Sequence, residues 1–290
     1  MTDPDAEETL GSSLSPAELR AALLGVARAR AADLTPADVL RRWAEDRLVR
    51  PTTGDPRRVA AVEAQVWRLL PADFQGVNLS PVTPLGTCTV VAPGSQDRIV
   101  STMRGNEVMS DLTNTLAIEA AVRRRPQAPD QEVHLAACTT VLRAQPFPAG
   151  RSQHFRLFGL VSSARDTGSG RTQARLLLRH VRLWQQTLAD LAQHLSPRIE
   201  IAAFDDDTVA ERLADSVLPA VRSDVPVGLL PGRERGRGYY AGAAVLLSLG
   251  RDTEVGDGGL TTWTAQLTGN AKERCMISCL ATERVASLLP

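Results

Sequence analysis

A long β-hairpin is the feature that most constrains the fold of this 290-residue chain. Two strand-like stretches, residues 133–145 and 153–163, are joined by a segment rich in proline and glycine, residues 146–151. Helical patterns are grouped between strands, and the regular β-α-β alternation of a doubly wound fold is missing. We therefore predict an α+β fold with a mixed, mostly antiparallel sheet flanked by helices.

The remaining elements are expected from apolar periodicity and turn residues. Further strands are expected at residues 77–82, 86–91, 98–103, 199–204, 239–249 and 274–280. Helices are expected at residues 55–70, 112–125, 172–195 and 207–221, and in a last segment that reaches Leu289.

The first fifty residues predict a short helical N-terminal extension, followed by a main domain over residues 51–290. Ser15 and Thr35 each precede a proline and lie three residues before an acid, which is the pattern of a capped helix start. Residues 50–54 have the composition of a linker. The extension is expected to dock on the main domain or on a partner, and the sequence leaves both open.

Composition excludes several function classes. Thirty-three basic residues balance thirty-three acidic ones, which argues against a nucleic-acid binder that relies on net charge. No apolar run approaches the ~20 residues of a membrane span, and residues 1–9 lack the order of a signal peptide. The four cysteines are scattered, and Cys275 and Cys279 are expected to be buried thiols. A cytoplasmic protein without a membrane partner is expected.

Common catalytic motifs and metal sites are not found. The only lysine, Lys272, does not stand in a phosphate-binding loop, and neither a zinc-binding H-E-x-x-H nor a G-x-S-x-G motif occurs. The run Asp205-Asp206-Asp207 fits a helix cap better than a magnesium site. We expect no protein metal site.

Four arginines have distinctive neighbours. Arg143 lies at the end of the first hairpin strand, and Arg151 lies in the hairpin loop four residues before Phe155. Arg235 comes shortly before a pair of tyrosines, and Arg284 follows an acid at the start of the last helix. Each alone is most simply a surface arginine.

In their order along residues 54–290, these elements resemble the catalytic core of class II aminoacyl-tRNA synthetases, most closely the histidyl-tRNA synthetase branch. The second motif of that class is matched by Arg143-Ala144-Gln145, the loop, and Arg151-x-x-x-Phe155. The later elements of the branch are matched in order by Arg235-Gly236, Tyr239-Tyr240, a Gly258-Gly259 turn and Glu283-Arg284. Pro81 or Pro84 would be the proline of the first motif.

The resemblance implies that ATP is bound, with Mg²⁺ as its usual companion. Arg143 would bridge the α-phosphate and the substrate carboxylate, and Arg235 would approach from the opposite side. Arg151 would hold the γ-phosphate, while Phe155 and Arg284 would cover the two faces of adenine. Gln145 stands where the family has an acid that reads the adenine amino group, and its amide still accepts a hydrogen bond.

The resemblance also places the amino acid. Asp111 and Thr113 match a Glu-x-Thr element that binds the α-amino group, although both also fit a helix cap. Leu157 and Val161 replace a glutamine and a glutamate that hold histidine, so a small substrate other than histidine is implied. Tyr239 and Tyr240 complete the implied amino-acid site.

The third motif departs from the family, because Ile277, Cys279 and Ala281 replace glycines, and their side chains are expected to crowd the nucleotide. No anticodon-binding domain is expected, which disfavours an ordinary tRNA synthetase.

The sequence admits three functions. The first is a stand-alone homodimeric enzyme that makes an aminoacyl-adenylate and transfers the acyl group to a carrier protein, a small amine or a tRNA. The alternative is a catalytically inactive paralogue that acts as a regulatory or assembly subunit of a partner enzyme, for which a regulatory protein of histidine biosynthesis is the precedent. A nucleic-acid module built on residues 233–237 is disfavoured by the neutral net charge.

Overall fold

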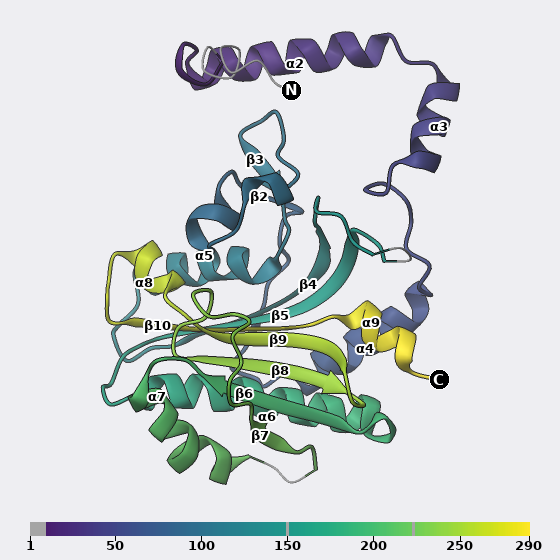
Figure 1. Ribbon diagram of the computed structural model, residues 1–290. Helices are drawn as coiled ribbons and strands as arrows, with labels where there is room; N and C mark the ends of the chain where they lie inside the picture. Colours follow the sequence, from purple (N-terminus) through teal and green to yellow (C-terminus); the bar gives the residue numbers. More distant parts are fainter. Residues whose placement is uncertain (1–9, 149–150, 222–223) are drawn as a thin grey trace.

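The computed structural model describes residues 10–148, 151–221 and 224–290. An eight-stranded sheet with strand order β1-β4-β5-β10-β9-β8-β6-β7 forms its centre (Figure 1). The pairs β1–β4 and β6–β7 are parallel and all other pairs in this sheet are antiparallel, so the predicted α+β class is confirmed. The strands are β1 (Gln75–Gly76), β4 (Val133–Leu142), β5 (His154–Arg165), β6 (Pro197–Ala203), β7 (Val227–Leu229), β8 (Ala243–Leu249), β9 (Thr253–Thr261) and β10 (Glu273–Leu280).

Helices cover both faces of the sheet. In Figure 1, α5 and α8 lie on one face, while α6 and α7 lie on the other, and α4 packs beside α9. A separate two-stranded sheet is formed by β2 (Val82–Pro84) and β3 (Asn106–Val108). The helices of the main body are α4 (Pro56–Leu69), α5 (Leu112–Arg124), α6 (Arg171–Ala192), α7 (Asp207–Arg212), α8 (Trp263–Thr268) and α9 (Thr282–Leu288).

Each face of the sheet has its own apolar core. Helix α6 buries Leu176, Trp184 and Leu188 completely against one face, as its apolar periodicity predicts. Helix α5 packs Leu112 onto the other face directly over Gly159 of β5. A Cβ at Gly159 would lie 2.3 Å from Leu112 Cδ1, so this glycine is needed for the close approach of helix and strand.

A chain of buried hydrogen bonds links α6 to the sheet. The Trp184 indole donates to Ser278 Oγ at 2.8 Å, and Ser278 lies 2.7 Å from His180 Nδ1. His180 Nε2 lies 2.8 Å from Ser162 Oγ, which lies 2.8 Å from His134 Nδ1. Because an indole can only donate, one direction satisfies the whole chain: each serine donates to a histidine Nδ1, and each histidine is neutral with its proton on Nε2.

This chain predicts that the protein loses stability in acid. Burial, followed by the nearby Arg179 charge, lowers the pKa of His134 to about 4, and burial holds the pKa of His180 well below its usual value. Between pH 6.5 and 4 the unfolded chain therefore binds protons that the folded chain does not. The free energy of unfolding should fall over this range by about 3 kcal/mol for His134 alone.

Urea denaturation at several pH values checks this prediction. A His134→Asn variant retains an acceptor for Ser162 but cannot titrate, so its stability should depend less on pH. The matched His194→Asn change alters an exposed histidine and should leave the wild-type slope unchanged. An equal slope in His134→Asn and the wild type would contradict the prediction.

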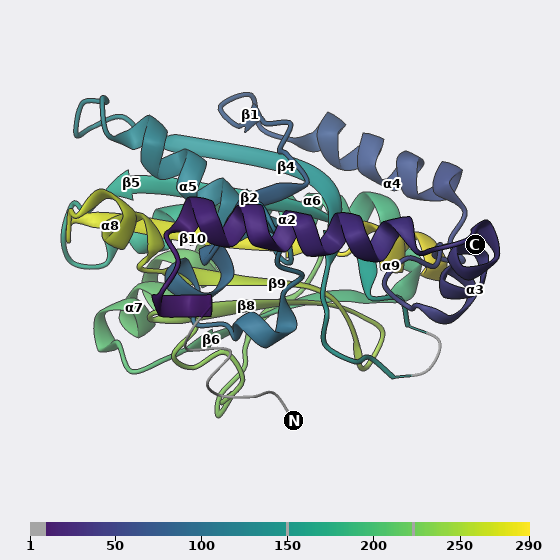
Figure 2. The ribbon, with the colours of Figure 1, turned by 90° about the horizontal axis from the view of Figure 1, so that it is seen from above.

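Helices α2 (Pro16–Ala32) and α3 (Pro36–Glu45) precede the main body. Both start with the capping boxes that the sequence predicts, at Ser15 and Thr35, and neither buries a side chain. Helix α2 runs across the α5 side of the molecule (Figures 1 and 2). After α3, Arg47 Nη2 donates to the carbonyls of Phe147 and Arg151 in the hairpin loop, at 3.1 Å each. None of the described helices is long and apolar enough to cross a membrane. Residues 1–9, for which the sequence predicts no signal peptide, lie outside the described residues.

The strands predicted at 77–82, 86–91 and 98–103 are largely wrong. Residues 87–91 form a π-helical turn, and residues 96–98 form a 3₁₀ turn. The β-branched composition of 87–91 resembles a strand, but the buried carboxylate of Glu107 accepts hydrogen bonds from the amides of Gly86 and Cys88, both at 2.9 Å. This contact, distant in sequence, curls the segment.

Three expectations after residue 200 also need correction. The expected Gly258-Gly259 turn is wrong, because both glycines lie inside β9, a strand that the sequence analysis missed. A Cβ at Gly258 would lie 2.4 Å from the carbonyl oxygen of Ile277, so the glycine serves close strand packing. The strand expected at 239–249 begins only at Ala243. The helix expected over 207–221 ends at Arg212 and continues as short π and 3₁₀ turns.

Candidate functional site

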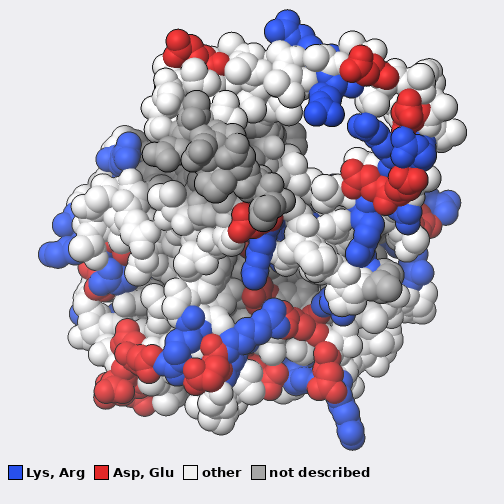
Figure 3. Space-filling model, turned by 45° about the horizontal axis from the view of Figure 1, so that its top comes forward, with Lys and Arg blue, Asp and Glu red and all other residues white. Residues whose placement is uncertain are grey.

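A large cleft of about 1830 Å³ lies between the hairpin, α9, the start of β9 and the segment between residues 233 and 240. Arginine and acidic side chains gather around the hollowed part of this face (Figure 3). Six acidic residues and ten arginines line the cleft, so it is positive although the chain as a whole is neutral. The arginines are Arg47, Arg50, Arg58, Arg98, Arg143, Arg151, Arg156, Arg233, Arg235 and Arg284.

Arg143 is held rigidly beside the start of α5. Its backbone amide donates to Gln153 at 2.8 Å, which continues the hairpin beyond β4. Its Nε donates to the carbonyl of Ser110 at 3.0 Å, and its Nη2 lies 3.9 Å from Asp111 Oδ2. Its guanidinium also lies over the ring of Phe155, 5.2 Å from the centroid. These contacts fix the charge in direction and place.

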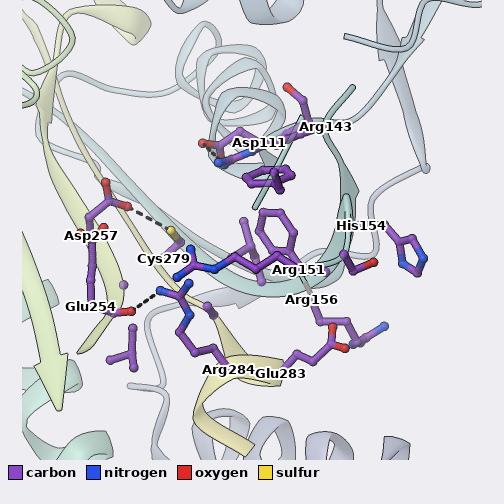
Figure 4. Close-up of a pocket in the computed structure, with 18 of the residues that line it drawn as sticks. Asp111, Arg143, Arg151, His154, Arg156, Glu254, Asp257, Cys279, Glu283 and Arg284 are labelled. Atoms are coloured by element: carbon purple, nitrogen blue, oxygen red, sulfur yellow. Dashed lines mark hydrogen bonds and ion pairs between the residues drawn. The ribbon is translucent and has the colours of Figure 1, made fainter. Parts of the chain in front are cut away.

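Two more arginines contact Glu254, a residue that the sequence analysis missed, and a third lies near one of them. Arg235 Nη1 pairs with the Glu254 carboxylate at 2.7 Å, and Arg284 Nη1 donates to its carbonyl at 2.5 Å. The side chains of Arg151 and Arg284 point into the same space (Figure 4). Burial, followed by the charge of Arg151, lowers the pKa of Arg284. Because these like charges repel each other, an anion placed between them would be stabilised.

The part of the cleft around Asp111 and Asp257, which we call its inner part, is acidic. Tyr240 donates to Asp257 Oδ2 at 3.0 Å, and Cys279 Sγ lies 3.5 Å from the other oxygen of that carboxylate. Burial, followed by the negative charge of Asp111, raises the pKa of Asp257. Two carboxylates that face the same space favour a cation between them. Asp257 was missed because the strand that carries it was not predicted.

Asp111 also caps α5, which is the helix-cap role that its place in the sequence fits. Its Oδ1 accepts hydrogen bonds from the Thr113 amide at 2.9 Å and from the Thr113 hydroxyl at 2.8 Å. Oδ2 is the oxygen that lies near Arg143. One carboxylate therefore fixes the helix start and contributes charge to the cleft.

The structure brings most of the sequence-predicted site residues to this cleft. Thr113 and Val161 are the exceptions: both are buried and do not line it. Of the three residues expected to crowd the nucleotide, Ile277 is buried in the core away from the cleft, whereas Cys279 and Ala281 line it. The predicted residues that line the cleft are Asp111, Arg143, Gln145, Arg151, Phe155, Leu157, Arg235, Tyr239, Tyr240 and Arg284.

Metal ligands are not clustered in the part of the chain that the structure describes. No group of three or more histidine, cysteine, aspartate or glutamate side chains is arranged there to hold an ion.

Comparison with known proteins identifies the fold. No protein-family model matches the chain, and the search of curated proteins finds no match. Histidyl-tRNA synthetase from S. aureus is similar in structure, with a TM-score of 0.55, 14% identity, and coverage of 87% of this chain and 66% of that chain. The chain therefore spans slightly less than two thirds of that protein.

Two other solved structures are similar over most of their own length. The histidine–tRNA ligase subunit from Alicyclobacillus acidocaldarius has a TM-score of 0.60 and 15% identity, over 82% of this chain and 96% of that chain. An ATP phosphoribosyltransferase regulatory subunit/histidyl-tRNA synthetase from Bacillus halodurans has a TM-score of 0.56 and 11% identity, over 83% and 82%. The chain thus has the fold of a histidyl-tRNA synthetase-like class II catalytic core.

Proposed function

We propose that this protein activates an amino acid with ATP to form an aminoacyl-adenylate, which it transfers to a carrier protein, a small amine or a tRNA. The observation that carries the proposal is that one cleft holds two carboxylates beside Arg143, those of Asp111 and Asp257, together with a group of further arginines that includes Arg151, Arg235 and Arg284. The positive ammonium group of an amino acid complements the carboxylates, and the negative triphosphate complements the arginines. The proposal includes a symmetric homodimer, with residues 1–50 as an extension of a catalytic unit formed by residues 51–290.

Each end of the cleft has a role in the reaction. The α-ammonium group would lie near Asp111 and Asp257, and the triphosphate would lie among Arg151, Arg235 and Arg284. Arg284, which the resemblance assigns to a face of adenine, would contact phosphate instead, because its side chain shares a space with that of Arg151. A carboxylate oxygen of the amino acid attacks the α-phosphorus, and the bond to the bridging oxygen breaks. Pyrophosphate leaves with the electron pair of that bond.

Arg143 lies where the two substrates would meet. Negative charge on the α-phosphate grows during the attack, and a guanidinium that is already oriented stabilises this charge without reorganisation. Its contacts with Ser110 and Asp111 provide that orientation. The Arg235 pair with Glu254 is largely exposed, with 73% of the Arg235 side chain accessible, so little free energy opposes its release toward phosphate.

The chemistry of the cleft fits ATP. Phe155 offers an aromatic face, and Gln145 offers an amide that can both donate and accept. Magnesium would neutralise phosphate charge when bound. Glu254, which lines the cleft beside Arg235, would be the protein carboxylate that holds the ion.

A second function is favoured by a specific observation. Cys279 and Ala281 line the cleft where a class II core is expected to have glycines, and their side chains narrow the space for a nucleotide. One of the similar structures is described as a regulatory subunit as well as a synthetase. On this alternative, the protein is a catalytically inactive subunit that regulates a partner enzyme.

ATP–pyrophosphate exchange with a panel of amino acids distinguishes these functions. Adenylate formation predicts exchange with at least one amino acid, and Arg235→Ala should slow it about 100-fold because a cation facing the transferred phosphate is lost. Arg182→Ala is a matched control, since Arg182 is exposed and bonds Ala220 away from the cleft. Exchange with none of the amino acids would favour the regulatory subunit.

A further inference from the structure

Beyond Asp111, the inner part of the cleft contains a buried polar atom without a hydrogen-bond partner. Asn114, in the first turn of α5, lines the cleft and is only 2% exposed. Its Oδ1 is buried and has no hydrogen-bond partner. Among the described residues that line the cleft, Arg233 Nη1 is the only other buried side-chain nitrogen or oxygen without a hydrogen-bond partner. A buried carbonyl oxygen without a donor is costly, so it indicates a place where a ligand donates.

The other half of the Asn114 amide is occupied. Its Nδ2 donates to Cys88 Sγ at 3.6 Å, and Cys88 Sγ lies 2.9 Å from Ser110 Oγ. Cys88 and Ser110 also line the cleft. When the Cys88 thiol donates to Ser110, its sulfur is left to accept from Asn114, and this arrangement leaves the amide oxygen as the free group.

A buried negative charge lies behind this corner of the cleft. Glu107 is completely buried, and its carboxylate accepts from the Gly86 and Cys88 amides and from Gln96 Nε2, at 2.9, 2.9 and 3.0 Å. The carboxylate therefore remains in place next to Cys88 without needing a ligand. Its charge favours a hydrogen-bond donor at the corner and disfavours an acceptor or an anion.

The position of Asn114 relative to Asp111 limits the length of the ligand. Residues three apart at a helix start lie on the same side, about one turn from each other. If the α-ammonium group binds near Asp111, a side chain of only a few atoms reaches Asn114. Ala92 and Leu157, which also line the cleft and belong to the same apolar cluster as Leu112, offer no counter-charge.

We infer that the activated amino acid has a short uncharged side chain ending in a hydrogen-bond donor, a hydroxyl or a primary amide, and that Asn114 selects it. This inference rests on the proposed function, since it assigns the substrate class of the same site. Asn114 is then a specificity-determining residue that contacts the substrate but not the reacting phosphate.

Matched substrate pairs test the inference. Threonine is compared with valine, and asparagine with leucine, in ATP–pyrophosphate exchange. A site that accepts a hydrogen bond from the substrate rejects an analogue without the donor. In at least one of the two pairs, kcat/KM for threonine or asparagine should therefore exceed that for valine or leucine at least about 100-fold. Asn114→Leu should reduce this ratio to below about 10 and leave the KM for ATP unchanged.

Thr115→Val is the matched control. Thr115 Oγ1 is also buried without a partner, but Thr115 does not line the cleft. This variant should keep the wild-type ratio. The wild-type ratio tests the inference even if Asn114→Leu fails to fold, and Asn114→Ala provides a smaller change for the same comparison.

The outcomes separate this inference from the proposed function. The wild type could exchange valine as well as threonine, and leucine as well as asparagine. This result would overturn the inference and leave the proposed function intact. Absence of exchange with every amino acid would overturn the proposed function. The inner site is then tested by calorimetric titration with threonine and asparagine, where saturable binding that valine and leucine lack would support the donor site and no binding would overturn it.

Discussion

Replacing Arg143 by alanine should reduce adenylate formation at least about 1000-fold while the protein remains folded. The guanidinium is positioned by the Ser110 carbonyl at 3.0 Å and by Asp111 at 3.9 Å, so its charge is available without reorganisation. Loss of such a charge from a phosphoryl transition state removes its largest electrostatic stabilisation. Exchange rates measured with both substrates varied would show the loss mainly in kcat.

Arg143→Lys should restore little of this activity. A lysine ammonium has no planar fork and cannot both keep the contact with Ser110 and face a phosphate. Arg182→Ala, away from the cleft, should retain the wild-type rate. An Arg143→Ala protein with more than about a tenth of wild-type activity would contradict the role assigned to this residue.

Glu273→Gln should destabilise the protein by about 3–5 kcal/mol, because it leaves the buried charge of Arg124 without a partner. Arg124 Nε and Nη2 donate to the two oxygens of Glu273 at 2.9 Å each, and the side chains are only 3% and 5% exposed. This pair ties the end of α5 to the start of β10. Urea denaturation at pH 7 measures the change.

Two further variants identify the cause. Replacing both Arg124 and Glu273 by leucine should recover much of the loss, because no buried charge then remains unpaired. Arg68→Ala breaks a pair with Asp190 whose side chains are 64% and 40% exposed, and it should cost less than about 1 kcal/mol. A loss below about 1 kcal/mol in Glu273→Gln would contradict this account.

Local signals made much of the fold predictable. The hairpin and the capped helices follow from strand patterning, turn residues and proline positions that act over a few residues. The order of the arginines along the chain likewise led to a synthetase-like core, and the structural neighbours confirm that fold. Most of the predicted site residues then meet in one cleft, because they lie on or next to strands β4, β5, β10, β9 and β8, which follow one another in the sheet.

Features set by distant contacts were not predictable in this way. Glycines at 258 and 259 usually indicate a turn, yet they lie in β9, where β10 approaches Gly258 closely and Ala243 and Tyr240 approach Gly259. Since β9 was missed, its two site carboxylates, Glu254 and Asp257, were missed with it. The π-helical turn at residues 87–91 depends on Glu107, which is about twenty residues away in sequence. In each case the decisive partner lies on another element.

Calorimetric titration with ATP tests the central claim most directly, because the account depends on a triphosphate site among Arg143, Arg151, Arg235 and Arg284. The wild type should bind ATP saturably at one site per chain, and Arg284→Ala should weaken this binding at least about tenfold, since a charge-assisted contact is lost. Arg182→Ala should bind ATP as the wild type does. No saturable binding in the wild type, or equal affinity in Arg284→Ala, would contradict the account.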